Sequence, residues 1–101
     1  MEHETTAGEN ILATVYEIIA ERKANPVEGA YTTYLFRQGV DKICKKVAEE
    51  GAEVVIAAKN QARDEIVDEV SDLIYHLSVL MVEFDISWSD IFAELKSRRE
   101  A

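Results

Sequence analysis

The sequence contains few of the residues that stabilise secreted or zinc-binding proteins. It has one cysteine, Cys44, which excludes an intramolecular disulfide. The chain also has two histidines, His3 and His76, which form no zinc-type spacing with the cysteine. No apolar run approaches the roughly 18 residues of a membrane-spanning helix, and the acidic N-terminus does not resemble a signal peptide. We therefore expect a soluble, cytoplasmic protein with no membrane partner.

Positive charge is also scarce. The chain has 11 Lys and Arg against 20 Asp and Glu, a formal net charge of −9. A general nucleic-acid binder needs a basic face that displaces counterions, so we expect no nucleic-acid partner. An anionic substrate would have to be met by local cations or by metal. The length of 101 residues predicts a single domain over residues 1–101 with a small core.

Apolar residues recur at helical spacing along almost the whole chain. A first helix is expected over residues 7–24, before Asn25-Pro26, because proline disfavours helix in the preceding residue. A short helix should end at Gly39, and a last helix should begin at Ser87 with the capping pattern Ser87-Trp88-Ser89-Asp90. The predicted fold class is all-α, a bundle of four to five helices.

Two amphipathic segments, residues 40–60 and 62–85, are expected to form an antiparallel helical hairpin with a tight turn at Asn60. Their apolar arcs place Cys44 in the core as a small apolar residue, and the aromatic spacing places Phe84 there as well. The first helix is apolar on two sides, and a chain this short has little core of its own. A second copy of the chain is therefore expected to complete the core as a homodimer.

The hairpin carries a set of acidic residues: Glu49, Glu50, Glu53, Glu69 and Asp72. At roughly 100° per residue, the acids lie along one border of each apolar arc. Antiparallel packing brings the two borders to the same side. Because Glu53 and Glu69 are equally far from position 61, as are Glu50 and Asp72, four carboxylates should converge at matching heights.

Such a cluster repels itself unless a cation is bound, because neighbouring like charges raise each other's pKa. Hard divalent ions that prefer oxygen ligands fit best, so Mg²⁺ is expected, with Mn²⁺ possible. The alternative is that the acids cover a solvated helix face and pair with Lys42, Lys45 and Lys46. For the set as a whole, we favour the metal site.

These residues form longer motifs that resemble a known family. The motifs are Tyr31-Thr32-x-x-Leu35, then Gly39-x-x-Lys42-x-x-Lys45-Lys46-x-x-Glu49-Glu50-x-x-Glu53, then Glu69-x-x-Asp72-Leu73-x-Tyr75-His76. They are similar to the phosphoribosyl-ATP pyrophosphohydrolases of the all-α, MazG-like nucleotide pyrophosphohydrolase superfamily. The resemblance covers positions 9 to 99. It implies Mg²⁺-dependent hydrolysis of phosphoribosyl-ATP to phosphoribosyl-AMP and pyrophosphate, the second step of histidine biosynthesis.

The resemblance also assigns roles to individual residues. It makes Glu50, Glu53, Glu69 and Asp72 the metal ligands. Glu49 is our candidate to orient or deprotonate the attacking water, and its alternative is a surface glutamate paired with a lysine.

The same resemblance, together with helical spacing, indicates which residues bind the substrate. Lys42 and Lys46 share the acidic side of their helix, where they meet the triphosphate. Tyr31 and Thr32 resemble residues that contact adenine or ribose. His76 lies one turn beyond Asp72, where it hydrogen-bonds a ligand carboxylate, reaches a phosphate or has a structural role.

The sequence leaves other functions open. One is a house-cleaning nucleoside triphosphate pyrophosphohydrolase with the same metal chemistry. Another is a non-catalytic helical dimer or adaptor. A di-iron bundle is disfavoured because the chain has no Glu-x-x-His pair. The favoured activity also implies a functional link to phosphoribosyl-AMP cyclohydrolase, which catalyses the next step of the pathway.

Overall fold

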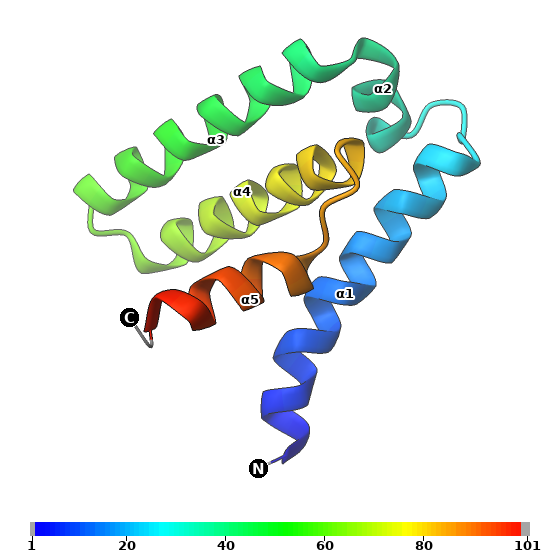
Figure 1. Cartoon of the computed structure of the whole chain (residues 1–101). Coiled ribbons are helices and arrows are strands. Elements are labelled where there is room, and N and C mark those ends of the chain that lie inside the picture. The colour runs from blue at the N-terminus through cyan, green and yellow to red at the C-terminus, as the bar shows by residue number, and fades with distance from the viewer. Residues whose placement is uncertain (1, 100–101) are drawn as a thin grey trace.

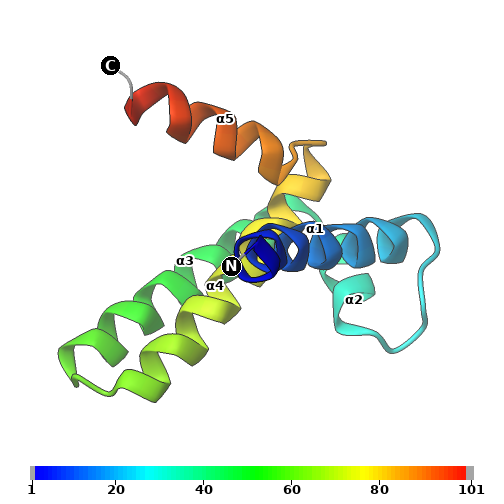
Figure 2. The same ribbon diagram turned by 90° about the horizontal axis from the view of Figure 1, so that it is seen from below.

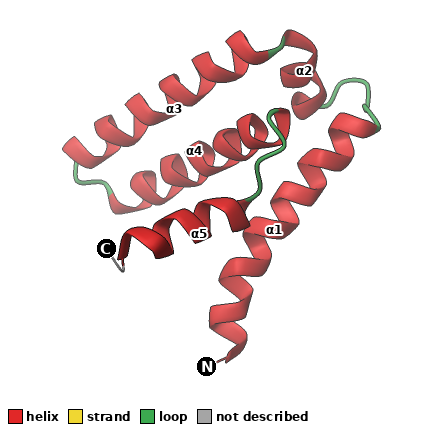
Figure 3. Ribbon diagram, viewed as in Figure 1, coloured by secondary structure: helices red, strands yellow, loops and turns green. Residues whose placement is uncertain are grey.

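The computed structural model describes the backbone of residues 2–99 and the side chains of residues 11–99. The described chain consists of helices without strands (Figure 3), so the predicted all-α class is confirmed. In order, the helices are α1 (Glu2–Ala24), α2 (Tyr31–Gln38), α3 (Val40–Lys59), α4 (Arg63–Glu83) and α5 (Trp88–Arg99). None of them combines the length and the apolar composition needed to cross a bilayer.

Helices α3 and α4 form the predicted hairpin and run antiparallel, side by side (Figure 1). Helix α3 ends at Lys59, and its C-cap residue Asn60 remains in the right-handed region. The left-handed residue of the turn is Gln61, with φ of 56°. The Ala62 amide donates to the Ala57 carbonyl at 3.3 Å and closes the turn. The turn sets the register of the two helices, and therefore which acidic residues lie at the same height.

Helix α2 lies at the end of the hairpin opposite this turn, beside the start of α3 (Figure 1). Gly39 alone separates α2 from α3 and has φ of 93°, a conformation that glycine adopts without strain. Its amide donates to Leu35 and its carbonyl accepts from Ile43, both at 3.1 Å. One residue therefore ends α2, begins α3 and turns α2 back toward α4.

The core is small and lies where α1, α2, α3 and α4 meet. Its buried members are Ile19, Leu35, Ile43, Val79 and Val82. Three of them, Leu35, Ile43 and Val79, have no exposed surface. The core therefore fixes α2 against both helices of the hairpin.

Helix α5 begins with the predicted capping box. The Ser87 amide donates to an Asp90 carboxylate oxygen at 2.9 Å, and the Asp90 amide donates to the Ser87 hydroxyl at 3.2 Å. The Trp88 indole donates to the Ser78 hydroxyl at 3.0 Å and ties the start of α5 to α4. From there α5 projects away from the α3–α4 hairpin (Figure 2), and it has no buried residue.

Two expected core residues are on the surface, and the predictions for them were wrong. Cys44 is exposed, and Phe84 is 56% exposed. On α3 the buried positions are Ile43, Glu50 and Ala57, so the inward face is rotated from the expected apolar arc. This rotation turns Cys44 outward and Glu50 inward. Helix spacing defines an arc, but contacts with neighbouring helices decide which part of it is buried.

Candidate functional site

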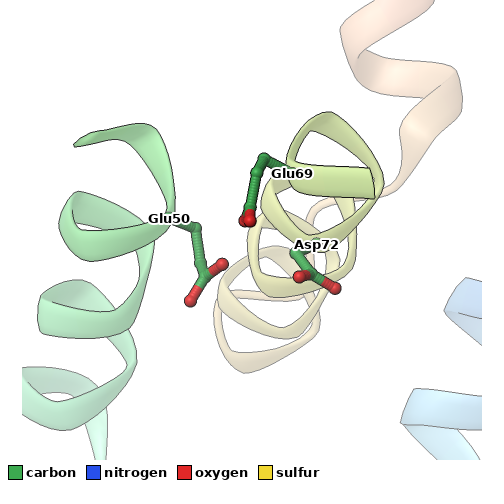
Figure 4. A group of neighbouring side chains, drawn as sticks. All are labelled: Glu50, Glu69 and Asp72. Atoms are coloured by element: carbon green, nitrogen blue, oxygen red, sulfur yellow. The ribbon is translucent and has the colours of Figure 1, made fainter. Parts of the chain in front are cut away.

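Three carboxylates converge between the helices of the hairpin. Glu50 reaches from α3 toward α4, and Glu69 and Asp72 extend from α4 (Figure 4). One oxygen of each lies within 4.8 Å of the other two. Glu69 and Asp72 share a face because residues three apart are neighbours on a helix. The antiparallel register then places Glu50 at their height, as the distances from the turn predict.

Glu50 is the buried member of this group, with 6% of its surface exposed. Its nearest cation is Lys46, whose Nζ lies 3.5 Å from Glu50 Oε2 and 3.3 Å from Glu49 Oε1. Burial by itself lowers the pKa of Lys46. The hydrogen bond to Glu49 and the surrounding negative charges outweigh this effect, so the pKa of Lys46 is raised. Lys46 therefore keeps its charge beside the carboxylates.

Glu69 has the least satisfied carboxylate of the group. Its Oε1 atom is buried and has no hydrogen-bond partner among residues 11–99, whose side chains are described. Burial raises the pKa of Glu69, and the charges of Glu53, Asp68, Asp72 and Glu50 raise it further. An unpaired buried carboxylate oxygen opposes folding, and a bound cation would remove that penalty. The donor set is all carboxylate oxygen, which fits a hard divalent ion such as Mg²⁺ or Mn²⁺.

The two remaining acids of the motif lie at the border of this group. Glu53 is exposed and does not belong to the group of three carboxylates whose oxygens lie within 4.8 Å of one another. Among the neighbouring charges, however, that of Glu53 raises the pKa of Glu69 the most. Glu49 is exposed and pairs with Lys46. Glu49 is one residue from Glu50 and so lies about 100° around α3, toward solvent, whereas Glu53 is three residues away and lies at the edge of the inward face.

A group of aromatic side chains joins α2 to α4 near the carboxylates. The ring of Tyr31 stacks with Tyr34 at 6.1 Å and with Tyr75 at 6.5 Å between centroids. The Tyr31 hydroxyl hydrogen-bonds His76 Nε2 at 2.9 Å, and His76 Nδ1 donates to the Asp72 carbonyl at 2.8 Å. The hydroxyls of Thr32 and Tyr75 also hydrogen-bond each other. Two of the predicted substrate residues, Tyr31 and Thr32, thus attach α2 to α4.

Tyr31 keeps its hydroxyl proton in this environment. Burial raises the pKa of Tyr31, the charge of Lys46 lowers it, and Tyr75, Glu50 and Tyr34 raise it. The net pKa is above the usual value, so the hydroxyl is a hydrogen-bond donor at neutral pH. Tyr31 thus experiences the charges of both Lys46 and Glu50.

A surface cavity of about 490 Å³ lies beside α2. Its lining residues are Glu28, Gly29, Ala30, Tyr31, Thr33, Tyr34, Arg37 and Gln38. Arg37 pairs with Glu28 at 3.1 Å, and Lys42 Nζ lies 5.7 Å from the centre of the Tyr34 ring. Tyr31 belongs both to this cavity and to the hydrogen-bonded chain that ends at Asp72.

Sequence reasoning gave no role to Tyr75 and did not predict the contact between Tyr31 and His76. Tyr75 follows Asp72 by three residues, so helical spacing already places it on the side of α4 that carries Asp72. The Tyr31–His76 contact joins positions 45 residues apart and has no comparable signal in the sequence.

Comparison with known proteins identifies a family for this chain. Residues 12–99 match the family described as phosphoribosyl-ATP pyrophosphohydrolase. A phosphoribosyl-ATP pyrophosphatase of Clostridium botulinum is 53% identical over 91 residues, covering 90% of this chain and 83% of the relative. One from Limosilactobacillus fermentum is also 53% identical, over 87 residues, covering 86% and 82% of the two chains.

A longer relative is the histidine biosynthesis bifunctional protein HisIE of Caldanaerobacter subterraneus subsp. tengcongensis. It is 61% identical over 97 residues, which are 96% of this chain and 47% of the relative. This chain thus spans about half of the bifunctional protein. The match along residues 12–99, together with these identities, confirms the family predicted from the motifs: the chain belongs to the phosphoribosyl-ATP pyrophosphohydrolase family.

Proposed function

We propose that this chain hydrolyses phosphoribosyl-ATP to phosphoribosyl-AMP and pyrophosphate, as the second step of histidine biosynthesis in the cytoplasm. The family and the relatives named phosphoribosyl-ATP pyrophosphatase support this reaction. The observation that carries the proposal is the group of Glu50, Glu69 and Asp72, in which the buried Glu69 Oε1 has no partner in the described chain. A single domain over residues 1–101 would contain this activity.

The proposed metal ligands are Glu50, Glu69 and Asp72, with Glu53 at the edge of the group. When bound there, Mg²⁺ or Mn²⁺ would neutralise charge on the phosphate oxygens and lower the pKa of a coordinated water. The closeness of the three carboxylate oxygens and the pKa of Glu69, raised by burial and by neighbouring charge, support this assignment.

Cationic side chains would bind the triphosphate beside the carboxylates. Lys46 is suited to this role because its raised pKa keeps it protonated at neutral pH. Lys42 lies one turn earlier on α3, next to the Tyr34 ring at the cavity. If a phosphate takes the place of the Glu49 carboxylate at Lys46, Glu49 is released to orient or deprotonate the attacking water.

The nucleoside end of the substrate would lie against α2. Tyr31 presents an aromatic face to the cavity, where adenine or a ribose can pack. Thr32 is the next residue of α2, followed by the buried Thr33. A substrate bound this way spans the distance from the cavity to the carboxylates, with Tyr31 between the two.

The deciding experiment measures pyrophosphate release from phosphoribosyl-ATP with Mg²⁺ and with excess chelator, with ATP and deoxynucleotides as competing substrates. Metal-dependent turnover of phosphoribosyl-ATP alone is expected. Turnover of other nucleotides instead would point to a house-cleaning pyrophosphohydrolase. A protein that hydrolyses none of them would refute an enzymatic role and favour the non-catalytic helical dimer or adaptor.

We also propose that the protein is a homodimer. Large apolar side chains remain uncovered, including Ile11, Ile18 and Val67, which are 59%, 57% and 55% exposed. An apolar groove of about 270 Å³ lies between α1 and α4. A second copy would bury these groups. Sedimentation equilibrium should give twice the mass of 11.4 kDa, and a monomer at micromolar concentration would refute the proposal.

A functional partner follows from the bifunctional relative. This chain spans 47% of that relative, whose name describes a bifunctional protein of histidine biosynthesis. We propose that a phosphoribosyl-AMP cyclohydrolase uses the product of this chain.

A further inference from the structure

We propose that His76 is a positioning residue that holds Tyr31 at a set distance from the carboxylate group. It does so through two hydrogen bonds, one to the hydroxyl of Tyr31 and one to the backbone of Asp72. This inference rests on the proposed function and deepens it, because it explains how the two ends of one substrate can be bound in register.

The partners of His76 require one tautomer of the neutral ring. The Asp72 carbonyl can only accept, so Nδ1 carries the proton and donates across 2.8 Å. The other nitrogen, Nε2, then has a free lone pair and accepts the proton of the Tyr31 hydroxyl across 2.9 Å. A directed chain therefore runs from Tyr31 on α2, through the imidazole, to the backbone of Asp72 on α4.

His76 cannot contact the substrate while this chain is intact. Only 6% of its surface is exposed, and both ring nitrogens are used. Any effect of His76 on catalysis must therefore pass through Tyr31 or Asp72. This excludes a direct contact with phosphate and assigns the residue to positioning.

The orientation of the Tyr31 ring is defined by several contacts. Besides the hydrogen bond, the ring meets the edge of the His76 ring at 5.7 Å and 76°, and it stacks with Tyr34 and Tyr75 at 26°. Even so, Tyr31 is 45% exposed and lines the 490 Å³ cavity. The residue is thus fixed on one side and open to a ligand on the other.

These contacts connect the two parts of the proposed binding site. The side chain of Asp72 belongs to the carboxylate group, and its carbonyl accepts from His76. The ring of Tyr31 forms a wall of the cavity. A substrate that occupies both places binds well only when their separation matches its own length, and small errors of placement reduce binding and rate.

The first test uses ¹⁵N spectra of the imidazole ring in the metal-free, substrate-free protein. At alkaline pH, where imidazole is neutral, His76 should show the Nδ1–H tautomer. Tyr31→Phe removes the donor and should shift the Nε2 resonance, whereas Tyr16→Phe on α1 is a matched hydroxyl deletion that should not. A dominant Nε2–H tautomer in the wild-type protein would overturn the proposal.

The second test is kinetic and uses three variants at these positions. Tyr31→Phe and His76→Asn should each raise KM for phosphoribosyl-ATP roughly three- to tenfold, the range of one lost neutral hydrogen bond, with kcat changed less. The double variant should be no worse than either single one. His76→Gln, which places an acceptor near the position of Nε2, should recover part of the loss.

Calorimetry with Mg²⁺ separates positioning from damage to the carboxylate group. Magnesium affinity should stay within about twofold in Tyr31→Phe, since that change removes no carboxylate. An unchanged KM in Tyr31→Phe would overturn the positioning role, and this variant remains decisive if the His76 variants fail to fold.

The proposed function and this inference fail in different ways. An inactive wild-type protein that shows the Nδ1–H tautomer would refute the reaction but retain the link between α2 and α4. An active wild-type protein with a normal KM in Tyr31→Phe would refute only the positioning role.

Discussion

Replacing Glu50 by glutamine tests the carboxylate group most directly. The substitution keeps the length and helix propensity of the side chain but removes its charge. Glu50 is 6% exposed, so water cannot easily replace a lost ligand at this position. The three converging carboxylates are reduced to two, and Lys46 loses one of its two partners. We expect Mg²⁺ binding and pyrophosphate release to be lost together.

The magnitude follows from linkage between binding and folding. At a Mg²⁺ concentration 100 times Kd, the ion stabilises the wild-type protein by about 2.7 kcal/mol. If the variant binds roughly 100-fold more weakly, the same concentration contributes about 0.4 kcal/mol. For a domain near 100 residues, the difference corresponds to about 10 °C or more in the Mg²⁺-induced rise of Tm.

The assay is thermal unfolding of the wild type and Glu50→Gln with and without Mg²⁺, together with pyrophosphate release. Glu17→Gln is the matched control, because it makes the same change of charge on an exposed position of α1. It should keep the full Mg²⁺-induced rise and full activity. A Glu50→Gln protein with the Mg²⁺ response and turnover of the wild type would refute the ligand assignment.

Three further predictions concern the site and the core. Because the pKa of Glu69 is raised, its ionised form destabilises the folded protein. The metal-free protein should therefore gain stability as the pH falls through that pKa. Over the same range, the Mg²⁺ affinity measured by calorimetry should decrease. Glu53→Gln should abolish hydrolysis while leaving metal-free Tm level or higher, through relief of repulsion; retained turnover would exclude Glu53 as a ligand. Leu35→Ala removes a fully buried side chain and should cost about 2–5 kcal/mol in the free energy of unfolding, measured by urea denaturation; a loss below about 1 kcal/mol would contradict the described core.

The helices and their ends were predictable because their signals are local. Pro26 follows the end of α1, Gly39 separates α2 from α3, and the capping box at Ser87 begins α5. The first helix was expected from residue 7 and begins at Glu2 instead. Such signals depend on residues within one or two turns of each other, so no knowledge of the packing is needed.

The site was predictable in part, for a related reason. Counting from the turn gives the correct register of the hairpin, and three of the four expected carboxylates lie together. The rotation of α3 about its axis was harder to predict from the sequence. Cys44 is exposed although its position on the apolar arc predicted burial, because neighbours on α2 and α4 select a face that includes Glu50. Helix periodicity defines a broad arc and leaves that choice open.

The sequence by itself determined the helices, the register of the hairpin, the acidic motif and the family, since each depends on short-range spacing. Only the tertiary structure decided that His76 accepts a hydrogen bond from the Tyr31 hydroxyl, that Glu69 Oε1 is buried with no partner in the described part of the chain, and that Glu53 is exposed. These features depend on how helices distant in sequence dock and rotate against one another. That docking is set by close packing of the whole core, which no local pattern encodes.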